Sequence, residues 1–250
     1  MAAGVDPSLV QALREHERAW RERPLLRALY RDWFRLVESR LSSRPGLSVE
    51  LGAGIGRFHE ACPWVVPTDV AQTPWAGSAV DAEDLPYAPG AVANLVLIDV
   101  LHHLARPARF LDEASRVLAP GGRVVILDPY CSPLSTLAYR LFHHERTDLG
   151  AAPFEEDAEV ARAPLAANQA LATLAFFRGR PELERRWLEL ALVERRRLAL
   201  LAYPLSGGFS RRPLVPHRVG RALLALEPAL AWLAPLAAFR CLVVLEKRPR

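Results

Sequence analysis

The fold of this chain is decided by the run Val49-Glu50-Leu51-Gly52-Ala53-Gly54-Ile55-Gly56-Arg57-Phe58. A short apolar run leads into three closely spaced glycines, and a helical pattern follows them. Glycine lets the backbone turn sharply, and because it lacks a Cβ it lets a ligand approach the backbone closely. The segment therefore predicts a strand, a glycine loop and the start of a helix, with a ligand held over the loop.

The spacing of the glycines narrows the class of ligand. A dinucleotide site uses the pattern G-x-G-x-x-G and holds a pyrophosphate at the start of the helix. Here Gly56 comes one residue early, and Arg57 stands where the third glycine is expected. Glu50, just before the loop, is a poor neighbour for a pyrophosphate and a suitable one for a cationic ligand. The loop therefore disfavours a nicotinamide oxidoreductase, which stays open as the less favoured alternative.

The sequence around the loop alternates between short apolar runs and helical patterns. This alternation is typical of parallel strands joined by crossover helices, and it predicts an α/β fold. A helix over Pro107–Leu118 leads through a tight turn at Pro120-Gly121-Gly122 into the fifth strand. We expect the first five strands at Leu47–Leu51, Trp64–Thr68, Ser78–Val80, Ala91–Ile98 and Arg123–Leu127.

The flanking segments extend this core into one domain that covers residues 1–250. Most of the chain between the fifth strand and residue 190 consists of helix-forming residues, which predicts a helical lid inserted after that strand and lying over the carboxyl ends of the strands. We expect two further strands, at Arg196–Ala202 and Phe239–Leu245, and a helix near Val219–Leu233. The expected divisions are N-terminal helices in 1–45, a cofactor-binding core in 46–130, the lid in 131–190, and the last two strands and helix in 191–250.

Composition excludes several classes of protein. Hydrophobic residues make up 51% of the 250 residues, which is enough for a full core and excludes a disordered chain. The 32 basic and 28 acidic residues are mixed along the chain, so the net charge of +4 does not indicate a nucleic-acid surface. Cys62, Cys131 and Cys241 form neither a disulfide framework nor a metal-binding knuckle. They predict free thiols in the reducing cytoplasm.

Neither a secretory signal nor a membrane span is expected from the sequence. The amino terminus carries Asp6 and lacks a continuous apolar region. The nearest approach to the roughly 18 apolar residues of a span is Ala229–Phe239, which is short and contains Pro235. Peripheral membrane contact stays open. The apolar segment Leu223–Ala238 also leaves a lipid-linked acceptor open, although burial against the sheet is the simpler interpretation.

Acidic residues and histidines follow the predicted strands. Asp69 follows the second strand, Asp81 the third and Asp99 the fourth, and the pair His102-His103 comes just after Asp99. Because the carboxyl ends of parallel strands meet at one edge of the sheet, we expect these side chains to surround one ligand.

Taken together, these motifs resemble class I S-adenosylmethionine-dependent methyltransferases of the bacterial small-molecule type. The resemblance covers about residues 47–128. It rests on Glu50–Gly56, Asp69, Asp81-Ala82-Glu83-Asp84-Leu85-Pro86, His102-His103-Leu104 and Arg116–Gly122. It implies a Rossmann-like, mostly parallel seven-stranded sheet with helices on both faces. It also implies S-adenosylmethionine as cofactor and S-adenosylhomocysteine as product.

The resemblance also assigns roles to individual residues. The glycine loop would cradle the methionine and ribose parts of the cofactor, through Gly52, Ala53, Gly54 and Gly56. Asp69 would hold the ribose hydroxyls, Asp81 and Ala82 the adenine, and the Asp99 region the amino-acid end. Glu50 joins this set as the carboxylate beside a cationic ligand. Tyr30, with Trp33, would cap the cofactor from the amino-terminal helices.

The acceptor is expected to be a small molecule. The fourth strand ends in Ile98-Asp99-Val100-Leu101, which lacks the Pro-Pro-aromatic motif of nucleobase amino-methyltransferases. The Pro-Cys pair of cytosine C5 methylation is absent as well, since Cys62-Pro63 has the reverse order. Nucleic acid is therefore disfavoured. Asn168, Gln169 and the Leu205–Phe209 loop are candidates for the acceptor pocket.

Histidines are the candidate general bases, because their ordinary pKa lies near 6.5. His102 and His103 are expected at the mouth of the site, and His144 belongs to the run His143-His144-Glu145 in the lid. Packing against the cofactor, or exposure at a helix end, is the alternative for each. The run His143-His144-Glu145 has the composition of a metal site, but adjacent histidines on a helix point about 100° apart and would not converge on one ion, so the sequence predicts no metal.

The sequence thus predicts an enzyme that transfers a methyl group to oxygen, nitrogen or carbon of a small acceptor. A secondary metabolite, a sugar or a lipid-linked intermediate fits this description. The alternative is a protein that binds S-adenosylmethionine without methyl transfer, as a partner subunit or for other sulfonium chemistry. The acceptor, the methylated atom and the oligomeric state stay open.

Overall fold

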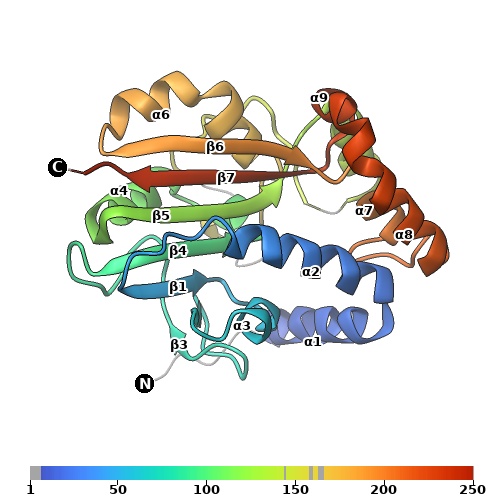
Figure 1. Cartoon of the computed structure of the whole chain (residues 1–250), viewed down its shortest axis with the longest axis horizontal. Helices are drawn as coiled ribbons and strands as arrows, with labels where there is room; N and C mark the ends of the chain where they lie inside the picture. Colours follow the sequence, from blue (N-terminus) through green and yellow to red (C-terminus); the bar gives the residue numbers. More distant parts are fainter. Residues whose placement is uncertain (1–6, 144, 158–159, 163–165, 250) are drawn as a thin grey trace.

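A seven-stranded sheet forms the centre of the computed structural model, which describes residues 7–143, 145–157, 160–162 and 166–249. The strand order is β3-β2-β1-β4-β5-β7-β6. β7 runs antiparallel to both of its neighbours, so its arrow in Figure 1 points left whereas those of β1 and β5 point right. The strands are β1 (Leu47–Leu51), β2 (Val66–Asp69), β3 (Ser78–Ala79), β4 (Val92–Ile98), β5 (Leu118–Pro129), β6 (Leu190–Leu198) and β7 (Arg240–Lys247).

Helices cover both faces of this sheet, as the sequence predicts (Figure 1). The α-helices are α1 (Pro7–Glu22), α2 (Pro24–Glu38), α3 (Arg57–Ala61), α4 (Pro107–Val117), α5 (Pro133–Phe142), α6 (Arg180–Arg186), α7 (Ala202–Ser206), α8 (His217–Leu226) and α9 (Ala234–Ala237). The other helical segments are the 3₁₀-helices η1 (Leu101–His103), η2 (Val160–Arg162) and η4 (Glu227–Leu233) and the π-helix η3 (Thr173–Arg178).

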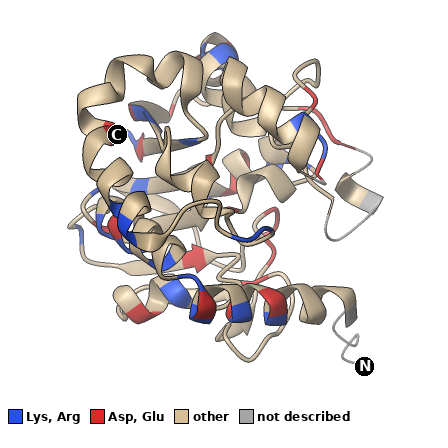
Figure 2. Ribbon diagram, turned by 90° about the vertical axis from the view of Figure 1, so that its right-hand side faces the viewer, with Lys and Arg blue, Asp and Glu red and all other residues tan. Residues whose placement is uncertain are grey.

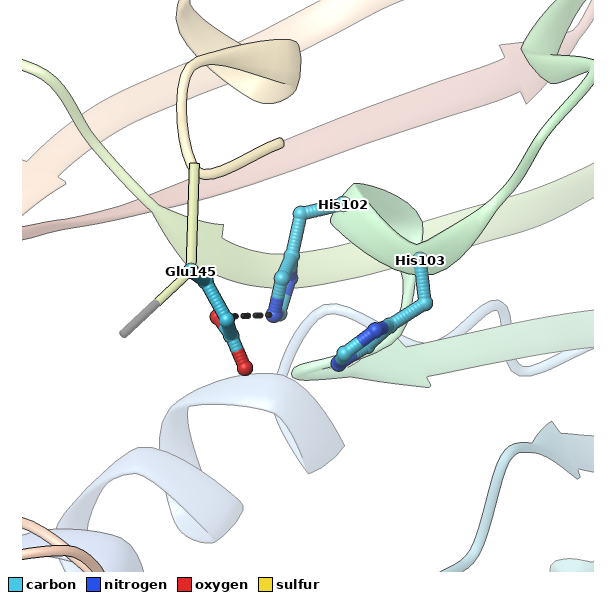
Figure 3. A group of neighbouring side chains, drawn as sticks. All are labelled: His102, His103 and Glu145. Carbon is cyan, nitrogen blue, oxygen red and sulfur yellow. Dashed lines mark ion pairs between the residues drawn. The ribbon is translucent and has the colours of Figure 1, made fainter. Parts of the chain in front are cut away.

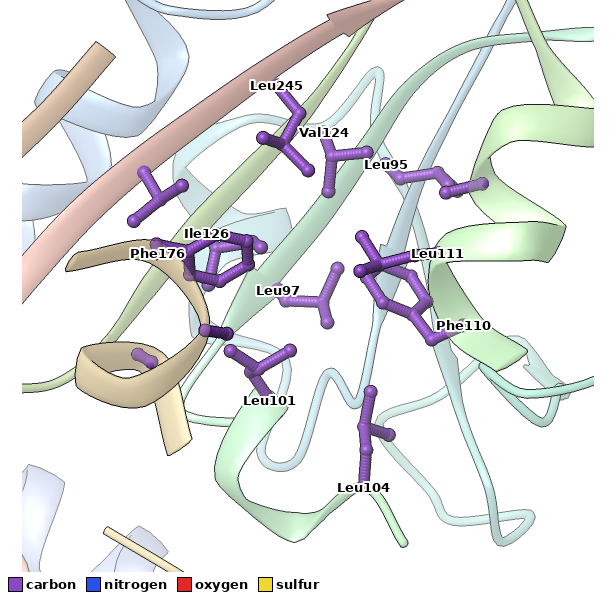
Figure 4. Close-up of a cluster of buried hydrophobic side chains, with 14 of the residues drawn as sticks. Leu95, Leu97, Leu101, Leu104, Phe110, Leu111, Val124, Ile126, Phe176 and Leu245 are labelled. Carbon is purple, nitrogen blue, oxygen red and sulfur yellow. The ribbon is translucent and has the colours of Figure 1, made fainter. Parts of the chain in front are cut away.

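The core lies on both faces of the central strands. Side chains alternate between faces along a strand, so Leu95, Leu97 and Ile126 pack with Phe110 and Phe176 in one cluster (Figure 4). Their strand neighbours face the other way. Val96, Val125 and Leu127 pack with Leu26 and Leu29 of α2 in a second cluster. A parallel sheet buried on both faces accounts for the continuous apolar runs of β4 and β5.

The position of β6 corrects the sequence prediction. The sequence predicts a strand at Arg196–Ala202, but β6 covers Leu190–Leu198. Because β6 is an edge strand, paired with β7 alone, it tolerates charged residues such as Arg195 and Arg196, which by themselves do not indicate a strand. The strand ends where Ala199 takes a left-handed backbone conformation, with φ of 61°.

The described part of residues 131–190 is less helical than expected. α5, η3 and α6 are helical, but most of the chain between Phe142 and Thr173 is irregular. The Tyr203–Phe209 segment also differs from the sequence prediction of a strand end followed by a loop. Its first part belongs to the helix α7, which ends before Gly207, where φ is 75°. Polar side chains such as those of Asn168 and Gln169 form hydrogen bonds in the irregular part, and Asn168 bonds to the backbone of Asp148. Backbone groups there can therefore find hydrogen-bond partners without forming a helix.

At the carboxyl end, α8, η4 and α9 join into one stretch, His217–Ala237, that passes the length and composition test for a membrane-spanning helix. The sequence prediction that no segment is long enough is therefore wrong on length. Pro235 is expected to interrupt the stretch, but the structure continues through it and through Pro228 with tighter turns. The stretch lies along the protein surface, and one stripe of it packs on the fold through Leu223, Leu224 and Ala234.

Candidate functional site

One cavity of about 1060 Å³ opens at the carboxyl ends of the parallel strands. One part of its wall comes from the glycine loop and from the ends of β2 and β4. The other part comes from α1, α5, the segment after α5 and the loop that follows α7. Strand ends meet at this edge because β1, β2, β4 and β5 are parallel, which is why polar residues far apart in the sequence share one space.

The glycine loop requires glycine for steric reasons. Gly52 has φ of 71°, and a Cβ there would lie 2.4 Å from Cγ2 of Val100. Gly56, at the start of α3, also has a left-handed conformation with φ of 68°. The Gly54 amide donates a hydrogen bond of 2.9 Å to Oδ2 of Asp69. The loop is therefore held against the end of β2, and Gly52, Ala53 and Gly54 face the cavity.

Glu50 is a buried carboxylate that lines the cavity. Its Oε2 atom has no hydrogen-bond partner among the described residues. Burial, together with the nearby charge of Asp69, raises the pKa of Glu50 to about 8. A buried carboxylate without a partner is costly. It is therefore suited to a cationic group of a ligand, as the sequence predicts.

The acids that follow β2 and β3 also reach the cavity. Asp69 is nearly buried, and burial raises its pKa although the Gly54 amide bonds to it. Oδ1 of Asp81 accepts a hydrogen bond of 2.8 Å from the Glu83 amide, and both Asp81 and the buried Ala82 line the cavity. Carboxylate oxygens accept more than one hydrogen bond, so these groups can bind hydroxyl or amino groups of a ligand as well.

Asp99, at the end of β4, is held by two groups from distant parts of the chain. Its Oδ2 accepts a 2.5 Å hydrogen bond from the Tyr30 hydroxyl, and its Oδ1 forms an ion pair with Arg240 of β7. Arg240 is buried, and burial lowers its pKa. Its guanidinium lies over the rings of Trp33 and Tyr203, at 5.5 and 5.3 Å. Tyr30 lines the cavity, whereas Trp33 packs in the core behind it.

His102 lies between the carboxylates of Asp128 and Glu145, and Figure 3 shows it beside Glu145. Its Nδ1 donates to Oδ1 of Asp128 at 2.9 Å, because a carboxylate only accepts, and its Nε2 lies 3.8 Å from Oε2 of Glu145. Burial disfavours the charged ring, but the charge and hydrogen bond of Asp128 and the charge of Glu145 outweigh it and raise the pKa of His102. The arrangement fixes the tautomer and directs Nε2 toward the cavity.

His103 has the opposite character. Its Nδ1 donates to the Ala166 carbonyl at 3.1 Å, and the centre of its ring lies 4.2 Å from that of His102. Burial, together with the charge of His102, lowers the pKa of His103 to about 4. The ring is therefore neutral at physiological pH. Both histidines lie where the sequence predicts, but their environments make His102 the stronger base of the two.

Glu145 reaches the histidines because the segment after α5 is bound to η1. The Asn168 amide donates to the His102 carbonyl at 2.8 Å, and the Gln169 side chain donates to Glu145. Burial disfavours ionisation of Glu145, but the charges of His102 and His103 lower its pKa overall. His144, the third predicted base, lies outside the described residues. Its neighbour His143 lines the cavity and lies 3.7 Å from Glu145.

The possible metal-ligand atoms of His102, His103 and Glu145 lie within 4.8 Å of one another. Two histidines and a carboxylate are residue types that bind metal cations such as zinc. The angular argument against a metal concerns His143 and His144 and does not apply to His102 and His103, because η1 is a single tight turn that stacks these two rings. The predicted absence of a metal stays a prediction.

Residues 49–126 match a family described as a methyltransferase domain. The glycine loop, Asp69, Asp81 and the η1 histidines all fall in this range. This match and the strand order support a class I S-adenosylmethionine-dependent methyltransferase core. No curated protein matches the sequence.

Solved structures share the fold of this chain at low identity. The [4+2]-cyclase SpnF is 16% identical, with a TM-score of 0.54 over 88% of this chain and 82% of that one. Geranyl diphosphate C-methyltransferase from Streptomyces coelicolor A3(2), in complex with Mg²⁺, geranyl diphosphate and S-adenosyl-L-homocysteine, is 13% identical, with a TM-score of 0.52 over 86% and 78%. A putative methyltransferase bound to the Trm112 activator of Haloferax volcanii is 16% identical, with a TM-score of 0.52 over 96% and 95%.

S-adenosylmethionine fits the residues present. The Oε2 atom of Glu50, which has no hydrogen-bond partner among the described residues, is suited to the positive charge of this ligand. Gly52 and Gly54 have no Cβ, so the ligand can approach the backbone there. These are features of this structure as well as of the family to which its core belongs.

Several residues of the site carry no sequence signal that points to their role. In the sequence, Asp128 is noticeable only because Asp128-Pro129-Tyr130 superficially resembles the motif of nucleobase amino-methyltransferases. Its pairing with His102 depends on the register of β4 and β5. Arg240 and His16 belong to no motif, although both line the cavity. An arginine in an otherwise apolar terminal strand, as in Phe239–Leu245, is the available signal for Arg240.

Proposed function

We propose that this methyltransferase acts on a small-molecule acceptor, at an oxygen, nitrogen or carbon atom. The observation that carries the proposal is that one cavity is lined both by the cofactor-type residues and by His102, whose ring is held from behind by the buried Asp128. Its volume of about 1060 Å³ is at the upper end of the range for single-ligand sites, about 300–1,000 Å³. There is thus room for a cofactor and an acceptor together.

The cofactor end of the cavity would be formed by Glu50, the glycine loop, Asp69, Asp81 with Ala82, and the Asp99 region. When bound, S-adenosylmethionine supplies a methyl group on a sulfonium sulfur, ready for in-line displacement. The chain's contribution to this step is alignment of the acceptor, which is a large part of catalysis for a two-substrate reaction. Tyr30 contributes by holding Asp99 in place through its hydroxyl.

The acceptor's proton, where it has one, would be taken by Nε2 of His102. Asp128 fixes the ring through Nδ1 and stabilises the imidazolium that forms. Glu145, 3.8 Å from Nε2, adds negative charge on the side where the proton arrives. His103, neutral and stacked on His102, would orient the acceptor through its Nε2. Both histidines therefore keep the catalytic roles that the sequence predicts, with His102 as base.

Methyl transfer in the cytoplasm is the setting we propose. The three cysteines are free and buried thiols, as a reducing compartment allows. Nucleic acid remains disfavoured as an acceptor.

Calorimetric titration with S-adenosylhomocysteine, beside NAD as a control, tests the cofactor end. We expect micromolar-range binding of the first and none of the second. Incubation with methyl-labelled S-adenosylmethionine and extract then tests transfer, and label in a compound of low molecular mass supports the proposal. Binding without any labelled product would favour the alternative, a protein that uses the cofactor pocket without methyl transfer. SpnF, which shares the fold, is named for a [4+2]-cyclase activity instead.

A further inference from the structure

An exposed apolar face borders the cavity at Phe142 and Leu214. Two helical segments form it, α5 and the stretch His217–Ala237, which pack against each other through α9. Several large side chains on it are far more exposed than folding requires, with Trp232 at 73% and Leu141 at 62%. We call the following set the apolar face: Leu134, Leu137, Leu141, Phe142, Leu214, Val219, Leu226, Trp232 and Leu236.

This face is not the side of the helices that stabilises the fold. Gly220 of α8 lies so close to α2 that a Cβ would be 2.2 Å from the Leu25 side chain. Leu223 and Leu224 pack on the second core cluster, and Leu230 and Leu233 on the first. Since this stripe already packs on the protein, the stretch is apolar on two sides and lies along the surface. It is placed to lie in a membrane interface, not to cross it.

The charged residues of the segments that carry the apolar face are mostly basic. Residues 129–143 and 210–239 contain five arginines and a single acid, Glu227. The surplus equals the net charge of +4 of the whole chain, so basic and acidic residues balance in the rest. Oε1 of Glu227 accepts hydrogen bonds of 2.9 Å from the Leu201 and Ala202 amides, so this acid faces the protein. Arginines 140, 211, 212, 218 and 221 are exposed.

The view from this side agrees with the sequence. Figure 2 shows Lys/Arg and Asp/Glu colours mixed along α1, whereas the helices above it are mostly without charge. An apolar face fringed by arginine is complementary to anionic lipid headgroups. It is a poor surface for a symmetric pair of this chain, because a two-fold axis would bring the same arginines together. Trp232, exposed on η4, is of a residue type enriched at membrane–water interfaces.

The apolar face also continues into the cavity. Phe142 and Leu214 belong to both, and Arg211 and Arg212 line the cavity beside them. Arg211, in the loop after α7, contacts the end of α5, since its Nε donates to the Phe142 carbonyl at 3.1 Å and its guanidinium lies 5.3 Å from the Phe142 ring. A molecule dissolved in the bilayer would reach the cavity along apolar surface, without passing through water.

We propose that the apolar face docks in the plane of an anionic membrane, and that the acceptor is a lipid-soluble molecule drawn from it past Phe142 and Leu214. The occupant of the face is the lipid surface itself. The inference deepens the proposed function, because it names the acceptor class, and it rests on methyl transfer taking place in this cavity.

Co-sedimentation of the full chain with vesicles tests the docking. We expect binding to vesicles of phosphatidylcholine and phosphatidylglycerol, and much weaker binding to phosphatidylcholine alone or at high salt. Arg218→Gln and Arg221→Gln should each weaken binding about fivefold, the equivalent of about 1 kcal/mol per arginine near the surface. Trp232→Ser should weaken it on both kinds of vesicle. The matched controls are Arg185→Gln and Leu188→Ser, both exposed and outside the apolar face.

Equal sedimentation with and without vesicles would overturn the docking. So would self-association in buffer, seen by sedimentation velocity, that Trp232→Ser abolishes, since the face would then be an interface between copies. The acceptor class is tested by extracting methyl-labelled product into organic solvent, and label confined to the aqueous phase contradicts it. Failure of S-adenosylhomocysteine to bind would instead contradict the proposed function, whatever the vesicles show.

Discussion

The two ends of the cavity are built in different ways. The cofactor end comes from residues 50–99, which lie at the ends of neighbouring strands and follow one another in the sequence. The proposed acceptor end comes from the segment after α5 and the loop after α7, which are far apart in the sequence. A short motif can encode the first end, because parallel strands bring their carboxyl ends together in any chain with this topology. The second end is assembled by packing.

Substitution of Asp128 tests the acceptor end with the largest expected effect. In Asp128→Asn the amide no longer holds the His102 tautomer or stabilises its charged form, and we expect turnover to fall by about 10²–10⁴. Affinity for S-adenosylhomocysteine should stay the same, because Asp128 does not line the cavity. Steady-state kinetics and calorimetry on one preparation measure both quantities. An equal loss of affinity would move Asp128 to the cofactor end.

The pH profile of the same variant gives an independent readout. The pKa of His102 is raised above its ordinary 6.5 in the native chain, so the rate should rise with pH through a midpoint above 6.5. Asp128→Asn should move this midpoint to lower pH.

His103→Ala should lower turnover with little change in cofactor affinity. The rate of this variant should still rise with pH in the same way as that of the native chain.

A methyl group at Gly52 tests the cofactor end. Gly52→Ala combines a left-handed backbone with a contact of 2.4 Å to Val100, and we expect it to lower the free energy of unfolding by about 2–5 kcal/mol and to abolish cofactor binding. Gly90→Ala is the matched control. Its φ of 73° carries the same backbone strain, but a Cβ there meets nothing within 4 Å. Thermal unfolding and titration of both variants separate strain from contact.

Asp69→Ala tests the ribose assignment. Loss of a charged hydrogen-bond acceptor should weaken S-adenosylhomocysteine binding by about 1–3 kcal/mol. Because Asp69 also accepts from the Gly54 amide, Asp69→Asn is the control that keeps an acceptor there. Unchanged affinity in Asp69→Ala, measured by calorimetry, contradicts the assignment.

Substitution of Glu50 is expected to change the free energy of unfolding by about 1 kcal/mol or more, by an amount that depends on pH. The pKa of Glu50 in the folded, ligand-free chain is raised to about 8, so its ionisation destabilises the fold. The stability that it contributes is full below the unfolded-state pKa, near 4.5, and is lost as pH rises through 8. Glu50→Gln should therefore raise the melting temperature at pH above 8 and change it little at pH 5, while weakening cofactor binding. A pH-independent effect contradicts the unpartnered carboxylate.

Chelation is expected to have the smallest effect. If His102 supplies the positive charge between Asp128 and Glu145, dialysis against EDTA leaves turnover and S-adenosylhomocysteine affinity unchanged. Loss of turnover that added Zn²⁺ or Mg²⁺ restores would show instead that His102, His103 and Glu145 hold a metal.

Much of the fold could be predicted because the signals are local. The apolar runs of β1, β4 and β5 and the break at Pro24 need no knowledge of their neighbours. β6 could not be placed in this way, because its charged residues are tolerated only at a sheet edge, and the edge is a property of the assembled sheet. The prediction of helix after α5 is wrong for most of that segment, since its backbone is satisfied by side chains such as Asn168 that act over long separations.

The sequence by itself determined which residues form the proposed cofactor end, namely Glu50, the glycine loop, Asp69 and Asp81, and the class of core that they indicate. Its information was sufficient because each residue's role depends on a strand end and a turn within a few positions of it. Only the tertiary structure decided which histidine has a carboxylate at Nδ1, that Asp99 pairs with Arg240, and that the terminal helices expose an apolar face fringed by arginine. Those features join residues that lie between 26 and 141 positions apart, so strand register and helix packing, not local pattern, set them.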